Sequence, residues 1–133
     1  MTYRTTACLN GEGGSGRCRG RVKKRTKDFA HRCVKLALSI STTILGKHCA
    51  NQLIRCSTSV AANYRSACLA QSRASFIAKI SIVLEEIDES AFWLEFIKDE
   101  KLIKNESIVS LIGEAGELKA IFYTSRKTAR SKK

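Results

Sequence analysis

The chain of 133 residues contains no proline, one tryptophan and two histidines. Average usage would supply about six or seven prolines, and a proline inside a helix removes a backbone hydrogen bond. Its absence therefore leaves long helices uninterrupted and favours an all-α fold. The apolar runs are only a few residues long, whereas a helix that crosses a bilayer needs about 20 apolar residues. The sequence thus predicts no membrane-spanning segment.

The start of the chain lacks the apolar core of a secretory signal, although it contains Arg4, Arg17 and Arg19. Six cysteines are present, but none of them forms a CxxC pair. Disulfide frameworks are typical of small secreted proteins, so we expect these cysteines to be reduced thiols. Cys33 and Cys56 fall on or beside predicted core faces, where a thiol packs as a small apolar group. These features indicate a cytoplasmic protein.

The acidic residues between positions 85 and 89 invite comparison with di-iron helical bundles. Those sites need Glu-x-x-His pairs, and neither His31 nor His48 has a Glu three residues before it. We therefore predict no metal site, and we expect this acidic cluster to form ion pairs that fix the helix register. The candidate partners are Arg55, Arg65 and Arg73.

Motifs for nucleotide binding and nucleophilic catalysis are absent as well. The glycines between residues 11 and 16 lack the Lys-Ser or Lys-Thr pair of a phosphate-binding loop, and no serine lies in a Gly-x-Ser-x-Gly context. We predict no catalytic residue and no cofactor. The chain is not expected to be an enzyme.

Apolar residues recur at heptad-like intervals in four segments, which predicts four amphipathic helices. The first begins near Thr26, passes Ile44 and ends at Gly46, and the others cover about residues 50–68, 72–98 and 106–128. Short links between them indicate an up-down-up-down antiparallel four-helix bundle over residues 26–128. Residues 1–25 form a disordered basic Gly/Arg-rich tail in this prediction, and residues 129–133 form a basic C-terminal tail. The predicted core faces contain Phe29, Cys33, Leu36, Ile40 and Ile44; Leu53, Val60, Tyr64 and Ala67; Phe76, Ile80, Leu84, Ile87, Ala91 and Leu94; and Ile108, Leu111, Ala115, Leu118 and Phe122.

The formal net charge of +12 is concentrated at the two ends of the sequence. Residues 28–125 contain as many acidic as basic side chains, so the ends account for the whole excess. Basic arms of this kind bind polyanions, most often nucleic acid, although a merely solvated tail is the alternative. The predicted nucleic-acid-binding residues are Arg17, Arg19, Arg21, Lys23, Lys24, Arg25, Lys27, Arg126, Lys127, Arg130, Lys132 and Lys133.

Asn63, Tyr64 and Arg65 are unusual inside a helix because all three bring hydrogen-bonding groups and asparagine is a poor helix former. One interpretation is that they hydrogen-bond across helices or subunits. The other is that they form, with Arg55, a polar groove for a phosphate or an acidic partner.

Several helices carry a second apolar patch opposite the first, for which a monomeric bundle has no evident use. In the third helix this patch contains Ile82, Trp93 and Phe96, and we predict that it is an oligomer interface. The alternative is that these residues only thicken one irregular core.

Four segments of the chain resemble the four-helix bundle protein family, also called the 23S rRNA intervening sequence protein family. They are KRTKDFA at 24–30, QLIRCSTSVAANYRSAC at 52–68, SRASFIAKISIVLEEIDESAFWLE at 72–95 and ELKAIFYTSRKTAR at 117–130. The chain departs from the family where Gly and Glu are common, with Ala61 and Ser66 around Ala-Asn-Tyr-Arg. Ser66 carries no charge, so it cannot form an ion pair of the family that needs that Glu.

The resemblance implies a cytoplasmic bacterial protein that assembles into a homo-oligomeric ring, expected to be a pentamer. Some relatives are encoded within insertions in ribosomal RNA genes, and a related group serves diversity-generating retroelements as accessory proteins that bind nucleic acid and protein. We therefore expect a non-enzymatic scaffold or accessory factor that binds RNA or DNA through its basic ends. The alternative is a protein–protein interaction scaffold with no direct nucleic-acid role.

Overall fold

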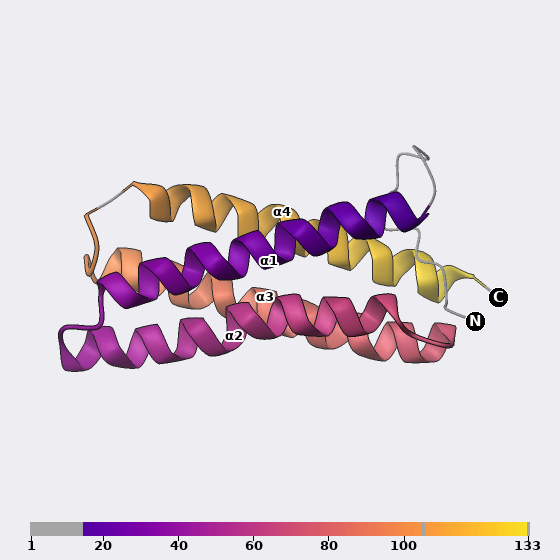
Figure 1. Ribbon diagram of the computed structural model, residues 1–133, viewed down its shortest axis with the longest axis horizontal. Coiled ribbons are helices and arrows are strands. Elements are labelled where there is room, and N and C mark those ends of the chain that lie inside the picture. The colour runs from indigo at the N-terminus through magenta and orange to yellow at the C-terminus, as the bar shows by residue number, and fades with distance from the viewer. Residues whose placement is uncertain (1–14, 105, 133) are drawn as a thin grey trace.

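The computed structural model describes residues 15–104 and 106–132, and it describes side chains from residue 19 onward. It contains four helices: α1 (Ser15–Ser39), α2 (Ile44–Cys68), α3 (Arg73–Asp99) and α4 (Ser107–Ser131). Consecutive helices run antiparallel, so α1 begins and α4 ends at the same end of the molecule (Figure 1). The predicted all-α, up-down-up-down bundle is confirmed.

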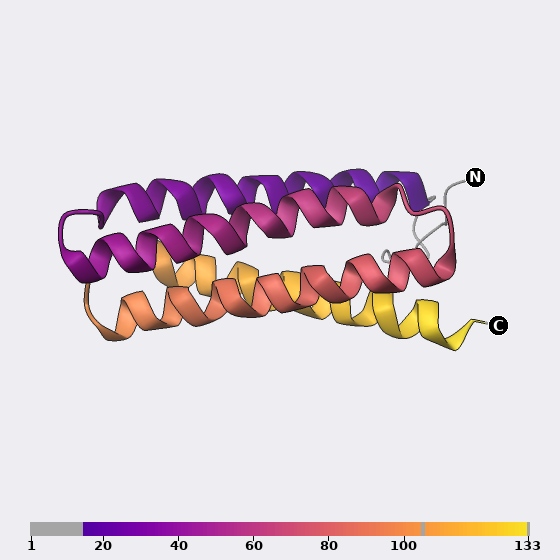
Figure 2. The same cartoon turned by 90° about the horizontal axis from the view of Figure 1, so that it is seen from below.

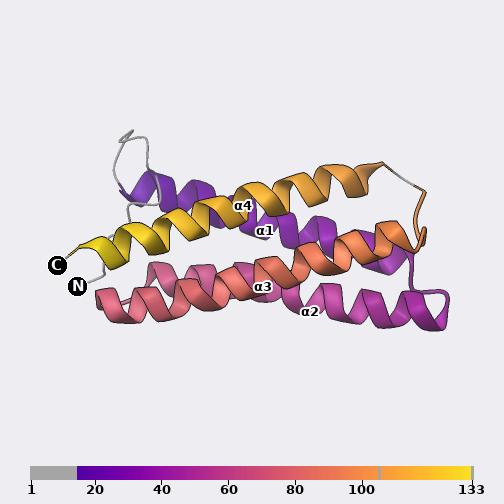
Figure 3. The same cartoon turned by 180° about the vertical axis from the view of Figure 1, so that it is seen from behind.

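The helices pack as a closed cycle of neighbours, and the predicted apolar stripes point into one core. α1 packs along α2, α2 along α3 and α3 along α4, whereas α1 and α4 contact each other over a shorter stretch (Figures 2 and 3). The largest fully buried side chains come from all four helices and include Phe29, Leu53, Tyr64, Phe76, Ile80, Ile87, Leu94, Leu118 and Phe122. The heptad-like spacing therefore identified most of the core, with Ala91 only half-buried.

The link between α1 and α2 differs from the prediction. Gly46 does not end the first helix but lies in the first turn of α2, where its backbone N–H donates to the Thr43 hydroxyl at 2.9 Å. A Cβ at Gly46 would collide with the carbonyl oxygen of Ile40, so this close approach of the two helices requires glycine. Ile44 begins α2 and is 91% exposed, so its predicted core position is wrong.

Besides α2, which begins at Ile44 rather than near residue 50, two helices extend beyond their predicted ends. α1 begins at Ser15 rather than near Thr26, and α4 continues to Ser131 rather than ending near residue 128. Arginine and lysine are good helix formers, and packing decides whether such a segment folds. Val22 is buried against the core, and Arg19 donates to the Cys68 carbonyl oxygen at 3.3 Å. Most of the basic residues that were assigned to tails thus belong to the bundle, while residues 1–14 and 133 lie outside the described part.

Ion pairs and hydrogen bonds connect neighbouring helices on the outside of the core. The Arg55 guanidinium pairs with Glu89 and, at 3.4 Å, with Glu86, which joins α2 to α3. Arg55 is thus the partner of the acidic cluster among the three arginines that were considered. Asp88 of the same cluster accepts instead from Lys119 of α4 at 2.7 Å.

The shorter seam between α1 and α4 has its own polar connection. Arg25 donates to both carboxylate oxygens of Glu114, at 2.6 and 3.1 Å, and to Glu117 at 3.1 Å. These carboxylates raise the pKa of the Arg25 guanidinium, and the hydrogen bonds to Glu114 are the main cause. Arg32 adds a hydrogen bond of 2.9 Å to the Ser110 hydroxyl.

The four cysteines whose side chains the structure describes are free and buried. Burial raises the pKa of the Cys33 thiol to about 12, with Cys56 adding to the shift, and raises that of Cys56 to about 11. Both thiols are therefore protonated near neutral pH and pack as small apolar groups. Their predicted placement in the core is confirmed, while Cys8 and Cys18 lie outside the described side chains.

Candidate nucleic-acid interface

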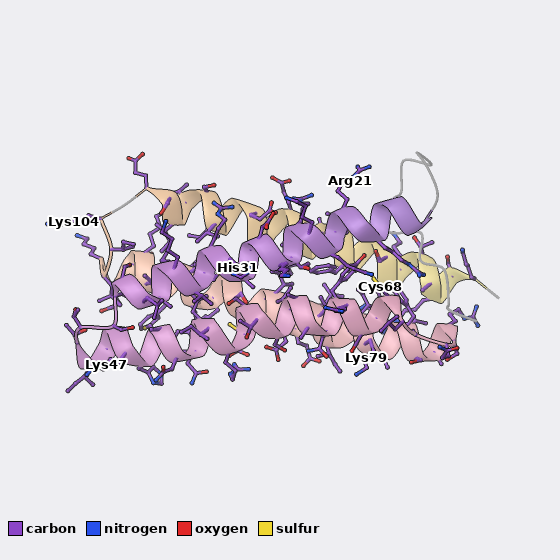
Figure 4. The ribbon with its side chains drawn as sticks, viewed as in Figure 1. Arg21, His31, Lys47, Cys68, Lys79 and Lys104 are labelled. Carbon is purple, nitrogen blue, oxygen red and sulfur yellow. The ribbon has the colours of Figure 1, made fainter. Side chains whose placement is uncertain are left out.

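The antiparallel topology brings basic residues from all four helices to one half of the bundle. This half contains the start of α1, the end of α2, the start of α3 and the end of α4 (Figure 1). Figure 4 shows Arg21 and Lys79 in the same half as Cys68, while Lys47 and Lys104 lie at the opposite end. We call it the basic half, and its cations are Arg19, Arg21, Lys23, Lys24, Lys27, Arg65, Arg73, Lys79, Arg126, Lys127, Arg130 and Lys132.

Few carboxylates oppose these cations. The sequence contains no Asp or Glu from residue 29 to 84 or from residue 118 to 133. The start of α3 and the ends of α2 and α4 fall within these acid-free stretches, so they enter the basic half with positive charge alone. Arg73 and Lys79 were not predicted as part of the site, although the long acid-free stretch around them was a signal that could have found them.

A groove between α1 and α2 lies on the basic half, with a volume of about 910 Å³. Its cationic lining comes from Lys23, Lys24 and Lys27 of α1 and from Arg65 of α2, with His31 beside them. Lys24 pairs with Asp28 at 3.4 Å, but both side chains are mostly exposed and the pair is therefore weak. The apolar lining consists of small side chains, which are Ala30, Val34, Ala61 and Ala62.

A second, smaller hollow of about 300 Å³ lies on the last turns of α4. It is lined by Tyr123, Arg126, Lys127, Arg130 and Ser131. The Arg126 guanidinium donates to the hydroxyl of Ser81 in α3 at 3.3 Å, which fixes its position between the two helices. Lys127 and Arg130 are exposed.

Not every basic residue of the prediction is available to a ligand. Arg25 is held in the α1–α4 seam by Glu114 and Glu117, and Arg19 is half-buried against the end of α2. The side chain of Arg17 and all of Lys133 lie outside the described part of the chain.

The predicted polar groove of Arg55, Asn63, Tyr64 and Arg65 does not form. Consecutive residues of a helix point about 100° apart, so three neighbours cannot share one surface. Tyr64 is fully buried, and burial raises the pKa of its hydroxyl, with the nearby Cys68 adding to the shift. Asn63 donates to its own helix at Ser59, and Arg55 faces α3. Only Arg65 reaches a groove, and that groove is the one between α1 and α2.

Of the predicted interface residues, Trp93 and Phe96 lie in the opposite half, whereas Ile82 lies in the first half of α3, less than one turn after Lys79. Ile82 is 39% exposed, whereas Trp93 and Phe96 are half-buried and pack against the core as well as against each other. Phe92, which the sequence analysis missed, is 53% exposed and packs its edge on Trp93 at 4.9 Å between ring centroids. The His48 ring contacts Trp93 at 5.5 Å from the other side. We call His48, Phe92, Trp93 and Phe96 the aromatic cluster.

Within the described ranges, no helix is long and apolar enough to cross a membrane. In the same part of the chain, no three His, Cys, Asp or Glu side chains gather in a way that could hold a metal ion.

Comparison with known proteins identifies the family of the chain. No curated protein matches it significantly. A crystal structure from Bacteroides thetaiotaomicron, described as a protein of unknown function from the S23 ribosomal protein family, is 31% identical, with a TM-score of 0.73. The alignment covers 82% of this chain and 97% of that one. The family model of the 23S rRNA-intervening sequence protein matches residues 20–124, which include all but the ends of the bundle. The chain therefore belongs to the 23S rRNA-intervening sequence protein family.

Proposed function

We propose that this protein is a non-enzymatic, homo-oligomeric bundle of the bacterial cytoplasm that binds RNA or DNA through its basic half, as a scaffold or accessory factor. The observation that carries this proposal is the convergence of cations from four helices on a region with almost no carboxylates. The like charges on such a surface repel one another until a polyanion neutralises them. A nucleic acid that binds there releases condensed counterions, which favours binding. The family name, which refers to 23S rRNA, points to the same ligand class.

Self-association supports the proposal because it multiplies weak contacts. The exposed Ile82 and Phe92 leave apolar surface on the outside of α3, and a second copy would cover it. The resemblance noted in the sequence favours a pentameric ring. Several basic halves held together raise the effective concentration for each further contact, so a long RNA should bind more tightly than a short one.

The test compares two variants that lose the same charge from opposite halves. In the first, four exposed residues of the basic half become serine: Lys23, Lys27, Lys127 and Arg130. In the matched control, four exposed lysines of the opposite half become serine: Lys35, Lys47, Lys98 and Lys104. Binding to a fluorescent 40-nucleotide RNA is measured by anisotropy across a salt series.

The first variant should lose about 10²- to 10³-fold in affinity at 0.1 M salt. Each lost phosphate contact reduces the steepness of log affinity against log salt concentration by about 0.7 to 0.9. The control should keep its affinity within about threefold and keep its slope, since salt screens charges that are distant from the ligand. Equal losses in both variants would show that only net charge matters and would refute a site in the basic half.

The groove between α1 and α2 favours a second candidate function. Its small apolar lining and cationic rim, formed by Lys23, Lys27 and Arg65, suit an amphipathic helix with acidic flanks. The protein would then be an interaction scaffold for an acidic protein, without a direct nucleic-acid role. Absence of RNA and DNA binding by the wild type at low salt would reject the first function and favour this one.

A further inference from the structure

One aromatic side chain in the basic half is exposed although its neighbours are buried. Tyr64, Phe76 and Phe122 are fully buried in the core, whereas Tyr123 is 54% exposed. In the described part of the chain, none of the aromatic ring contacts involves Tyr123. The core therefore makes little use of its ring.

The surroundings of Tyr123 are cationic. Residues three, four and seven positions later lie on the same face of a helix, and here they are Arg126, Lys127 and Arg130. Together they line the hollow at the end of α4. The closest carboxylate in the α4 sequence is Glu117, and no other follows it to the end of the chain. An exposed ring thus stands beside three positive charges without an acidic residue on the same turns.

This combination matches the chemistry that binds single strands. Base–aromatic stacking provides affinity with any base, while a basic track follows the phosphates. The bases of a duplex already stack on one another and are not available to a side chain, so a stacking site distinguishes single strands from duplexes. The hydrogen bond from Arg126 to Ser81 fixes one cation beside the ring, and Lys127 and Arg130 are exposed to follow the strand.

We propose that Tyr123 stacks on an unpaired base of single-stranded nucleic acid, while Arg126, Lys127 and Arg130 bind the adjacent phosphates. This inference rests on the proposed nucleic-acid function and gives that function a preference for unpaired segments. The groove between α1 and α2, which offers cations but no Phe, Tyr or Trp ring, then binds the phosphates of the same strand or of the flanking duplex.

The test uses three substitutions at Tyr123 in the full-length protein. Tyr123→Ala and Tyr123→Leu remove the π-face, and Tyr123→Phe keeps it. Binding to a 12-nucleotide oligo(A) and to a 12-base-pair duplex is measured by anisotropy at several salt concentrations. The first two variants should bind oligo(A) about 5- to 100-fold more weakly, because stacking contributes that much per base. Tyr123→Phe should stay within about twofold of the wild type, and duplex affinity and salt slope should not change in any variant.

A spectroscopic readout separates stacking from phosphate contact. Trp93 is the one tryptophan of the chain, so Trp93→Phe combined with Tyr123→Trp places a single indole at the site. Its fluorescence should be quenched by oligo(A) but not by inorganic phosphate at equal ionic strength or by the duplex. The parent variant Trp93→Phe with Tyr123 intact controls for the loss of the native tryptophan.

The outcomes distinguish this inference from the function on which it rests. Wild type that binds neither probe at low salt overturns both. If Tyr123→Ala binds oligo(A) as tightly as the wild type does, the stacking site alone is overturned. An equal loss of affinity for oligo(A) and for the duplex in Tyr123→Ala overturns it as well. A change in sedimentation of Tyr123→Ala without a change in single-strand preference would assign Tyr123 to a subunit contact and would also overturn the inference.

Discussion

The two halves of the bundle place their aromatic side chains differently. In the basic half Tyr64, Phe76 and Phe122 are fully buried, with 5.5 Å between the ring centroids of Tyr64 and Phe122, and the exposed Tyr123 lies among cations rather than against another ring of the described residues. In the opposite half Phe92 is exposed and Trp93 is half-buried on the outside of α2 and α3. The surface charge differs as well, because the basic half exposes cations almost alone while the opposite half mixes both signs.

This difference separates two physical tasks along one helical scaffold. Exposed cations without carboxylates attract polyanions over a distance but cannot pack closely against one another. Exposed aromatic rings among mixed charges favour association, because the free energy falls when another protein surface covers the rings. Mutations in one half should therefore affect the ligand, and mutations in the other should affect assembly.

The largest effect is expected from truncating an aromatic ring in the basic half. Phe122→Ala should lower the free energy of unfolding by about 3–5 kcal/mol, because it leaves a cavity against Tyr64 in a packed core. Phe92→Ala, the same substitution at an exposed site of the opposite half, should cost less than about 1 kcal/mol. Chemical denaturation followed by circular dichroism measures both. Similar losses in the two variants would refute the contrast between the halves.

The second effect concerns assembly through the exposed apolar residues of α3. Ile82→Ser and Phe92→Ser should each weaken self-association by about 2 kcal/mol if these residues are central to the contact. Sedimentation equilibrium should give a mass several times 14.7 kDa for the wild type and a lower average mass for the double variant at equal concentration. Helicity should remain, because both side chains are partly exposed in the single subunit.

Leu38→Ser is the matched control for that experiment. Leu38 of α1 is an apolar residue with 67% exposure and lies outside α3. Dissociation caused by Leu38→Ser but not by Phe92→Ser would place the contact on α1. A wild type that stays monomeric at micromolar concentration would reject self-association altogether.

The sequence predicted the fold well because the four apolar stripes are regular and because no proline interrupts them. It predicted the site less well. Two charged segments looked like tails because their composition is polar, but helix formation depends on packing, and Val22 and Ala129 supply buried contacts at both ends. The convergence of Arg73 and Lys79 with these segments follows from the antiparallel topology. It could have been derived once the four helices were placed in order.

The polar groove failed for a different reason. Asn63, Tyr64 and Arg65 were grouped because they are adjacent in sequence, whereas adjacency on a helix separates side chains onto three faces. Trp93 and Phe96 were assigned to an oligomer interface, with a thickened core as the alternative, and each is large enough to contact the core and the surface at once. Pattern alone does not give the depth to which a large ring is buried.

The smallest effect is expected where α3 ends, in the opposite half. Lys101 has a φ of 56°, and Leu102 N–H donates to the Ile97 carbonyl at 3.2 Å while Lys101 N–H donates to Lys98 at 3.0 Å. This is the Schellman arrangement, in which glycine is favoured because it has no Cβ to oppose a left-handed backbone. Lys101→Gly should therefore raise the free energy of unfolding by about 0.5–1 kcal/mol.

The same substitution three residues earlier should have the opposite sign. Lys98 lies in the last turn of α3 with helical geometry, and Lys98→Gly should lower stability by about 1 kcal/mol, because glycine is a poor helix former and the charge near the helix C-terminus is lost. Thermal unfolding measures both variants. Each of them removes one cation from the opposite half, so RNA affinity should stay within about twofold of the wild type. A clear loss of RNA binding in either variant would extend the ligand contact beyond the basic half, and a destabilised Lys101→Gly would contradict the assigned backbone conformation.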